Sequence, residues 1–333
     1  MSKTKKSNLI FTDDEHARML MSDNFNFALD KDSGVSACCG KTVNDSPEYD
    51  PVGPQELIFK IDEKFNLESY LKQFIFLANI KVKKDKTEFE SVNNVLQSLS
   101  QENLTVLSTV ASVVLIFDNT LITLKLNDIL QFKNFITKFK IPVIIQLNIN
   151  NVISDELLTK LKLLGTSIQL RTDDKFINFP ANINLLHENN FIISSKFIVT
   201  KENYKLAKDF CQNYLCAIVN KDEAIKVYFL KPYVTVTQYK EIQNAFLENE
   251  LKNCRIATCN NKHFNSKAPN MHMLPMDCDA SRFSIYIENN NIYPCEFCQN
   301  VCYNMDNCKS IIDFWQNKDM QKFRKKIINN NYC

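Results

Sequence analysis

The residues with the most evident chemistry in this chain are cysteines, and they are unevenly distributed. No cysteine lies between Cys39 and Cys211. Seven of the twelve follow residue 258: Cys259, Cys278, Cys295, Cys298, Cys302, Cys308 and Cys333. Four thiolates that converge in space hold zinc or an iron–sulfur cluster. The distribution therefore predicts a C-terminal metal-binding module attached to a body that is poor in cysteine.

The spacing of these cysteines favours a cluster site over a zinc ribbon. The module has one CxxC pair, Cys295 with Cys298, and lacks a second pair at ribbon spacing. Alternating apolar residues, a polar turn at 288–291 and a return to Cys295 predict a β-hairpin that Cys278 and Cys295 flank. We expect Cys259, Cys278 and Cys295 to be ligands. The sequence leaves open which other cysteines complete one or two sites: Cys298, Cys302, Cys308 and Cys333.

The overall composition excludes several classes of function. The chain has 333 residues, 45% of them hydrophobic, and a formal net charge of +2, which suits one large domain and a smaller one. Its basic runs are short, so no nucleic-acid partner is expected. No apolar run approaches the length of a membrane span. Because no export signal is recognisable, we expect a cytoplasmic protein, in which clustered cysteines bind metal rather than form disulfides.

Glycine is nearly absent. The chain has four glycines, and none lies between Gly53 and Gly165 or after Gly165. A phosphate-binding P-loop and a dinucleotide-binding GxGxxG turn are therefore both excluded. Because asparagine adopts the left-handed backbone conformation more readily than most residues, we expect it to replace glycine at several turns.

Strand and helix patterns alternate from residue 55 onward. Strands are predicted at 57–61, 143–149, 167–170, 193–199 and 225–230. Helices are predicted between them, including one from Ser154 to Gly165, while 104–124 is ambiguous. This alternation predicts a parallel sheet or an open (β/α) barrel. Residues 1–23 are expected to be loose and 24–53 to form a hairpin, giving three regions: 1–53, 54–252 and 253–333.

Three stretches of the C-terminal module form a recognisable pattern: the sequence CDASRFSIYI from Cys278, the sequence IYPC ending at Cys295, and a predicted helix containing Trp315 and Arg324. Together they resemble the auxiliary-cluster domain (SPASM or twitch domain) of radical S-adenosylmethionine enzymes. Cys259 and Cys333 stand where members of that family carry further cluster cysteines. By this resemblance the module binds an iron–sulfur cluster, most simply one [4Fe-4S], with zinc as the alternative metal.

The N-terminal region resembles the lead-in of peptide-modifying members of the same family. The matching sequence motifs are GKT at 40–42, SPEY at 46–49 and GPQEL at 53–57. The resemblance implies an α/β fold: a partial (β/α)6-type open barrel, with an N-terminal β-hairpin and a C-terminal cysteine-rich module of a β-hairpin plus a helix. It also implies a peptide as the substrate or partner.

One departure from that family is severe. Its reactive cluster needs a CxxxCxxC motif just after the first barrel strand, and this chain reads FNLESY at 65–70 instead. The glycine turn that approaches S-adenosylmethionine is also missing. We therefore expect a degenerate member that neither binds S-adenosylmethionine nor cleaves it.

Three functional hypotheses remain from the sequence. The first is a binding or partner subunit that presents a peptide to an active homologous subunit. The second is an iron–sulfur enzyme with altered use of S-adenosylmethionine, and the third is a structural zinc protein. No catalytic residue is identified. A concave opening is expected at the carboxyl edge of the strands near Asp173 and Lys231, narrowed by Phe65 and Tyr70.

Overall fold

The structure is a computed structural model in which the chain divides into two compact units. The first contains Met1–Val114, Asn127–Val143 and Ala280–Arg324, and the second contains Leu115–Leu126, Ile144–Asp279 and Lys325–Cys333. The residues that the structure describes are 10–13, 17–22, 25–30, 36–40, 53–78, 80–82, 104–106, 110–117, 119–148, 152–165, 167–172, 179–199, 224–229, 254–258, 275–276, 284–298, 302–308, 311–315 and 317–322.

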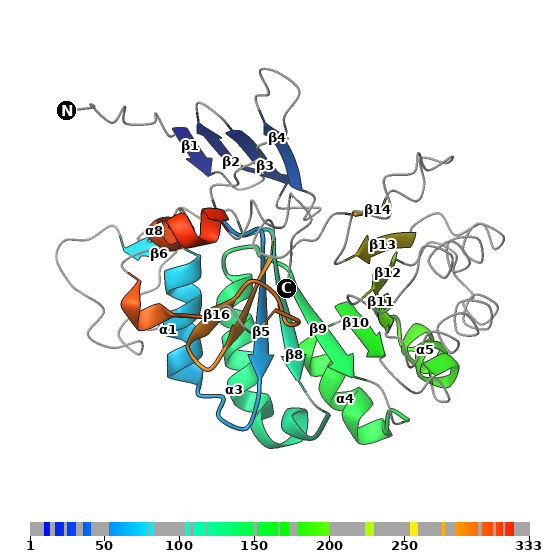
Figure 1. Ribbon diagram of the computed structural model, residues 1–333. Helices are drawn as coiled ribbons and strands as arrows, with labels where there is room; N and C mark the ends of the chain where they lie inside the picture. Colours follow the sequence, from blue (N-terminus) through cyan, green and yellow to red (C-terminus); the bar gives the residue numbers. More distant parts are fainter. Residues whose placement is uncertain are drawn as a thin grey trace, which may run out of the picture. The chain divides into compact units, whose positions relative to one another are not determined.

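Parallel strands in chain order form the sheet of the second unit (Figure 1). They are β9 (Val143–Asn148), β10 (Ser167–Thr172), β11 (Ile192–Val199), β12 (Ala224–Phe229), β13 (Cys254–Thr258) and β14 (Pro275–Met276). Each pairs in parallel with the next. Helix α4 (Asp155–Leu164) connects β9 to β10, and α5 (Phe179–Glu188) connects β10 to β11. The predicted alternation is confirmed here.

The ends of α4 lie where the sequence predicts them. The Ser154 hydroxyl accepts a hydrogen bond of 3.2 Å from the backbone N–H of Leu157, which caps the first turn. At the other end Gly165 has a φ of 133°, in the region that favours glycine. The buried leucines of this helix are Leu157, Leu158, Leu161 and Leu164. One face of α4 therefore belongs to an apolar core.

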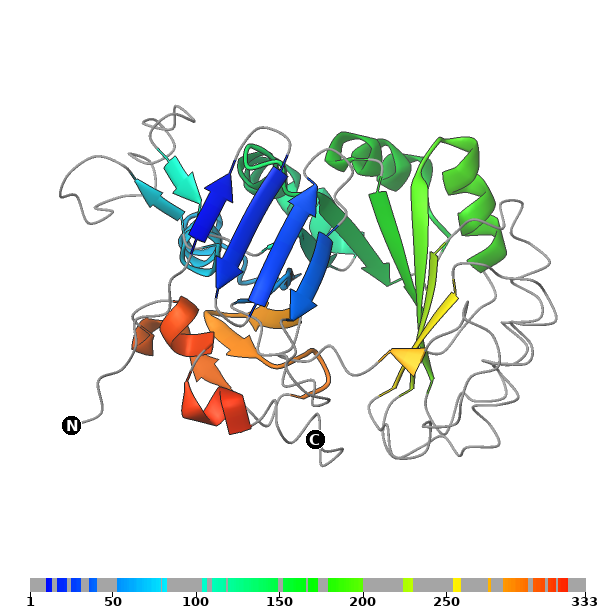
Figure 2. The same cartoon turned by 90° about the horizontal axis from the view of Figure 1, so that it is seen from above.

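One face of the sheet in this unit supplies the rest of that core. Alternate residues of β9 to β11 are apolar and buried: Ile145, Leu147, Ile168, Leu170 and Ile193. Because side chains alternate across a strand, the residues between them lie on the opposite face. Helix α5 contacts β11 and lies along one side of β10 and β11 (Figure 2). Helices thus cover one face of the sheet.

The first unit has a mixed sheet in the order β8-β5-β15-β16-β17. Its strands are β5 (Glu56–Ile61), β8 (Ser112–Phe117), β15 (Ser284–Glu288), β16 (Asn291–Tyr293) and β17 (Tyr303–Asn304). Strand β15 pairs with β5 in parallel, whereas β16 is antiparallel to both β15 and β17. The predicted C-terminal hairpin is confirmed, and it extends the sheet beside β5.

Helices pack against this sheet. Helix α1 (Leu67–Leu77) is capped by Asn66, whose side chain accepts from the backbone N–H of Ser69. Helix α3 (Asn119–Thr137) follows β8 and is interrupted at Lys125. The remaining elements are β6 (Ile80–Val82), β7 (Leu104–Val106), the short 3₁₀ helix η3 (Met305–Asn307) and α8 (Ile311–Trp315). The ambiguous segment 104–124 therefore holds two strands and the start of a helix.

The N-terminal region forms an antiparallel sheet in the order β1-β2-β3-β4. Strands β3 (Phe25–Asp30) and β4 (Ser36–Gly40) are the predicted hairpin. The expectation that residues 1–23 are loose was wrong, because β1 (Ile10–Asp13) and β2 (Ala17–Ser22) pair with each other and β2 pairs with β3. Strand preference depends on cross-strand neighbours, which a short polar stretch does not reveal on its own.

The turn between β15 and β16 uses asparagine where hairpins commonly use glycine. Asn289 and Asn290 have φ values of 50° and 64°. Glu288 pairs with Asn291, so these two residues form the loop. Positive φ at both positions is the geometry of a type I′ turn, whose twist matches that of the flanking strands. The prediction that asparagine replaces glycine is confirmed at this turn.

These observations confirm the α/β fold with a partial open barrel. Helices predicted around 92–99, 200–210 and 237–251 lie outside the described residues, and the boundaries at residues 53 and 252 stay predictions. Within the described part of the chain, no helix is long and apolar enough to span a membrane.

Candidate functional site

Aromatic side chains fill the region that follows β5. Phe65 and Tyr70 are 4% and 2% exposed, and their ring centroids lie 4.6 Å apart. The Tyr70 ring also lies 5.9 Å from the ring of Phe59 on β5 and 5.9 Å from that of Phe132 on α3. Such separations are typical of packed aromatic pairs. We call Phe59, Phe65, Tyr70, Phe74 and Phe132 the aromatic cluster.

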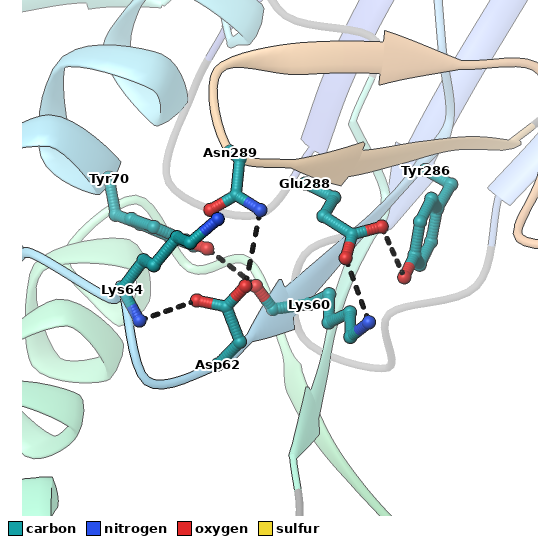
Figure 3. A network of polar contacts seen from close by, with 7 residues as sticks. All are labelled: Lys60, Asp62, Lys64, Tyr70, Tyr286, Glu288 and Asn289. Carbon is teal, nitrogen blue, oxygen red and sulfur yellow. Dashed lines mark hydrogen bonds and ion pairs between the residues drawn. The ribbon is translucent and has the colours of Figure 1, made fainter. Parts of the chain in front are cut away.

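A polar network lies beside the aromatic cluster, at the carboxyl end of β5 (Figure 3). The Tyr70 hydroxyl donates to the backbone carbonyl of Lys60 at 2.5 Å. The Asp62 carboxylate accepts from the backbone N–H of Lys64 at 2.8 Å and from the side-chain amide of Asn289 at 3.2 Å. Asp62 therefore links the loop after β5 to the turn of the C-terminal hairpin.

A second set of contacts joins the same two strands. The Lys60 ammonium lies 2.8 Å from one oxygen of Glu288, and the Tyr286 hydroxyl donates to the other oxygen at 3.3 Å. The Lys60 side chain is 42% exposed and that of Glu288 is 17% exposed. An ion pair this open to solvent contributes about 1 kcal/mol or less. The network therefore acts mainly to position the hairpin against β5.

The ionisation of Tyr70 gives this arrangement a measurable pH dependence. Burial, followed by the charges of Asp62 and Glu288, raises its pKa far above the ordinary value of 10.0. Above pH 10 the unfolded state loses this proton while the folded state keeps it. The free energy of unfolding should therefore fall as the pH rises above 10.

Tyr70→Phe should reduce this alkaline loss of stability. At neutral pH it should cost about 1 kcal/mol, because the Lys60 carbonyl loses its donor. Denaturant titrations of both proteins across the alkaline range measure the two effects. An unchanged alkaline slope in the variant would show that the buried phenol is not its source.

The CxxC pair occupies a single turn after β16. The backbone N–H of Cys298 donates to the carbonyl of Cys295 at 3.3 Å. Cys298 is 1% exposed, and Cys295 is partly exposed. Two thiols on one turn suit two of the four ligands of a zinc or iron–sulfur site. The structure thus brings this pair of predicted ligands together.

Cys302 and Cys308 lie elsewhere on the hairpin. Cys302 is exposed and precedes β17, beside Tyr293, with which it shares a side-chain hydrogen bond. Cys308 follows η3, near the turn end of the hairpin, and its thiol donates to the Asn304 carbonyl at 3.6 Å. Burial raises the pKa of the Cys308 thiol. Cys308 therefore sits at the opposite end of β16 from the CxxC turn.

The convergence of all seven cysteines stays a prediction. Cys259, Cys278 and Cys333 lie outside the described residues, as do Asp173 and Lys231 with the opening expected near them. Within the described ranges, no three histidine, cysteine, aspartate or glutamate residues come together as a metal site. A complete site at the CxxC turn would need ligands from the rest of the chain.

The polar network was not anticipated from the sequence. Lys60, Asp62 and Glu288 are ordinary charged residues in the sequence, and Lys60 and Glu288 are 228 residues apart. Their meeting depends on the parallel pairing of β15 with β5. The sequence offered one signal for this network, namely that Lys60 and Asp62 lie at the end of a predicted strand. In α/β proteins, residues at the carboxyl ends of strands lie at the edge of the sheet where functional sites are built.

Comparison with known proteins supports the fold. No protein-family model matches the chain, and no curated protein matches it. The structure is similar to that of SuiB from Streptococcus suis, with a TM-score of 0.51 and 14% identity over 95% of this chain and 90% of SuiB. It is also similar to SuiB bound to S-adenosylmethionine, with a TM-score of 0.50 and 13% identity over the same shares of both chains.

A third structure, SuiB bound to the precursor peptide SuiA, aligns with a TM-score of 0.37 at 11% identity, covering 94% of this chain and 90% of SuiB. That alignment is too weak to support a shared fold. The two better alignments support the α/β fold, which this chain shares with SuiB.

Proposed function

We propose that this protein is a radical-S-adenosylmethionine-like binding subunit that has lost the reactive cluster and keeps an auxiliary metal centre in its C-terminal module. The observation that carries the proposal is the aromatic cluster after β5. Phe65 and Tyr70 are packed in the core, in the stretch where the resembled family places its thiolates.

A reactive cluster does not fit the residues of this stretch. An iron–sulfur cluster needs thiolate ligands, and the loop and first turn at 62–70 contain none. The space beside β5 is occupied by the rings of Phe59, Phe65 and Tyr70. No chemical step through such a cluster is therefore assigned to this chain.

The auxiliary centre is proposed at the CxxC turn. Cys295 and Cys298 supply two thiols there, and the proposed further ligands are Cys278 and Cys259, with the tail cysteines as alternatives. An iron–sulfur cluster would supply a redox centre at this position, and zinc would supply a structural cross-link. In either case, the task of the protein residues around the metal centre is to hold the C-terminal hairpin in place.

The proposed partner is a peptide or an active homologous subunit. Support comes from the lead-in resemblance to peptide-modifying proteins and from the fold shared with SuiB. Purification of the tagged protein from its native host under anaerobic conditions should recover one such partner at near-equal stoichiometry. Recovery of the chain as a monomer with no bound protein or peptide would contradict the partner role.

An active enzyme with altered use of S-adenosylmethionine is the second candidate. The observation that favours it is the likeness to SuiB in its S-adenosylmethionine-bound form. Metal analysis does not separate the two candidates, because both keep a cluster, whereas binding and cleavage of S-adenosylmethionine do.

We expect no cleavage of S-adenosylmethionine by the purified chain. The reduced, metal-reconstituted protein should form no 5′-deoxyadenosine above the level of a protein-free control, because thiolates are missing at 62–70. Chromatography of the reaction mixture measures this product. Multiple turnovers that depend on the protein, without any partner, would overturn the proposal and favour the second candidate.

A further inference from the structure

The turn that carries Cys295 and Cys298 has a geometry that suits an internal disulfide. The backbone N–H of Cys298 donates to the carbonyl of Cys295 at 3.3 Å, which closes the turn. The first and last Cα atoms of such a turn lie within about 7 Å of each other. Cysteines joined by a disulfide have Cα separations of about 4.4–6.8 Å. A bond between the two sulfur atoms therefore requires rotation of side chains and little movement of the backbone.

The residue before the turn holds it at a fixed place in the module. Strand β16 ends at Tyr293, and Pro294 has no N–H with which to extend the pairing of the strands. Pro294 is also buried, and its ring fixes the backbone angle φ. The chain therefore leaves the sheet at Cys295. Because the turn is already formed there, its two thiols are held at a high effective concentration relative to each other.

The two thiols differ in their access to solvent. Cys295 is partly exposed, whereas Cys298 is 1% exposed. Thiols and disulfides exchange when a thiolate attacks a sulfur atom of the disulfide, so a dissolved disulfide meets first the thiol that solvent reaches. Cys295 is therefore placed to begin an exchange, and Cys298 is placed to complete it inside the protein.

The other described cysteines of the module have contacts away from this turn. Cys302 shares a side-chain hydrogen bond with Tyr293, and the Cys308 thiol donates to the Asn304 carbonyl at 3.6 Å. A disulfide needs two thiols, whereas a zinc or iron–sulfur site needs four ligands. The described part of the chain thus supplies every residue that a disulfide at the turn requires.

We propose that the CxxC turn is a thiol–disulfide exchange site that closes a reversible disulfide between Cys295 and Cys298, with a small dissolved disulfide, RS–SR, as the oxidant. The Cys295 thiolate attacks one sulfur of RS–SR, the S–S bond breaks, and RS⁻ leaves. The Cys298 thiolate then attacks the Cys295 sulfur of the mixed disulfide and releases the second RS⁻. The protons of the two protein thiols go to the two RS⁻ ions. The protein dithiol is thereby oxidised, and RS–SR is reduced to two RSH.

This exchange deepens the proposed function, because it would regulate the proposed metal centre, and it rests on that proposal for this consequence alone. The thiolate is the form of cysteine that binds metal, and a sulfur atom in a disulfide is no longer a thiolate. Metal binding and the internal disulfide therefore exclude each other. An oxidising ratio of disulfide to thiol should lower the metal content of the protein, and reduction should restore it.

Equilibration of the full-length protein with mixtures of oxidised and reduced glutathione, in the presence of a chelator, tests the proposal. Alkylation of the remaining thiols and peptide mass mapping then show which cysteines are oxidised. Cys295 and Cys298 should lose their labels together as the oxidised fraction of glutathione rises, and both should regain them after addition of dithiothreitol. The matched control is Asn307→Ser, an exposed change in the same module, which should leave this response unchanged.

Single variants separate the roles of the two thiols. Cys298→Ser should stop after the first step, so that one glutathione stays bound to Cys295. Cys295→Ser should form no mixed disulfide at Cys298 in the time that converts Cys298→Ser completely, because Cys298 is 1% exposed. Wild-type protein provides a measurement that does not depend on how the variants fold: iodoacetamide should label Cys295 before Cys298.

Several results would overturn the inference: equal labelling rates of the two thiols in the folded wild-type protein, a disulfide from either of them to another cysteine, or two thiols that stay reduced at every glutathione ratio. A Cys295–Cys298 disulfide in a protein that never takes up metal would uphold the inference and refute the metal centre. Stoichiometric metal uptake by a protein whose two thiols stay reduced after chelation would refute the inference and leave the proposed function standing.

Discussion

Replacing Phe132 with alanine is expected to destabilise the first unit by about 3–5 kcal/mol. Phe132 is fully buried, and its ring packs edge-on against Phe59 at 5.4 Å and Tyr70 at 5.9 Å. It also lies 6.2 Å from Phe65 and 6.3 Å from Phe74. Truncation would leave a cavity bordered by four rings that are held by β5, by α1 and by the loop between them. Their positions limit the collapse that would reduce the cost.

Denaturant unfolding followed by fluorescence or circular dichroism measures this effect. The control is Leu124→Ala, in the part of α3 that precedes the interruption at Lys125. Leu124 is 77% exposed, so this change should alter stability by less than about 0.5 kcal/mol. Phe132→Leu keeps most of the volume and should cost less than the alanine variant. A loss at Phe132→Ala no larger than at Leu124→Ala would mean that the aromatic cluster is not a packed core.

Replacing both Cys295 and Cys298 with serine is expected to reduce the metal content of the purified protein to background. The two residues share one turn, and serine is a poor ligand for zinc or iron compared with thiolate. Because metal binding contributes to folding free energy in such modules, the temperature of unfolding should fall as well. The prediction depends on the proposed ligand set, which includes residues beyond this turn.

Anaerobic purification followed by absorption spectroscopy and counts of iron, sulfide and zinc tests this prediction. Asn307→Ser, an exposed change in the same module, should leave the metal content unaltered. The single variant Cys302→Ser tells whether the exposed cysteine belongs to the site. Stoichiometric zinc would favour the structural zinc hypothesis, and a wild-type protein that is folded but free of metal would contradict any metal centre.

Local patterns in the sequence predicted the elements well. The helix from Ser154 to Gly165 was predicted because its cap, its leucine periodicity and its terminal glycine are all contained in twelve residues. The C-terminal hairpin was predicted because alternation and a polar turn are also local signals. The strands at 10–13 and 17–22 were missed because their pairing, rather than their composition, makes them strands.

The sequence by itself determined the alternating α/β architecture, the absence of thiolates after the first barrel strand and the concentration of cysteines near the C-terminus. Only the tertiary structure decided how these features are placed. It joined Lys60 to Glu288 through the pairing of β15 with β5, and it packed Phe65 and Tyr70 with Phe132. The physical reason is that strand register depends on contacts between distant segments, and a shift of one residue moves a side chain to the other face of the sheet.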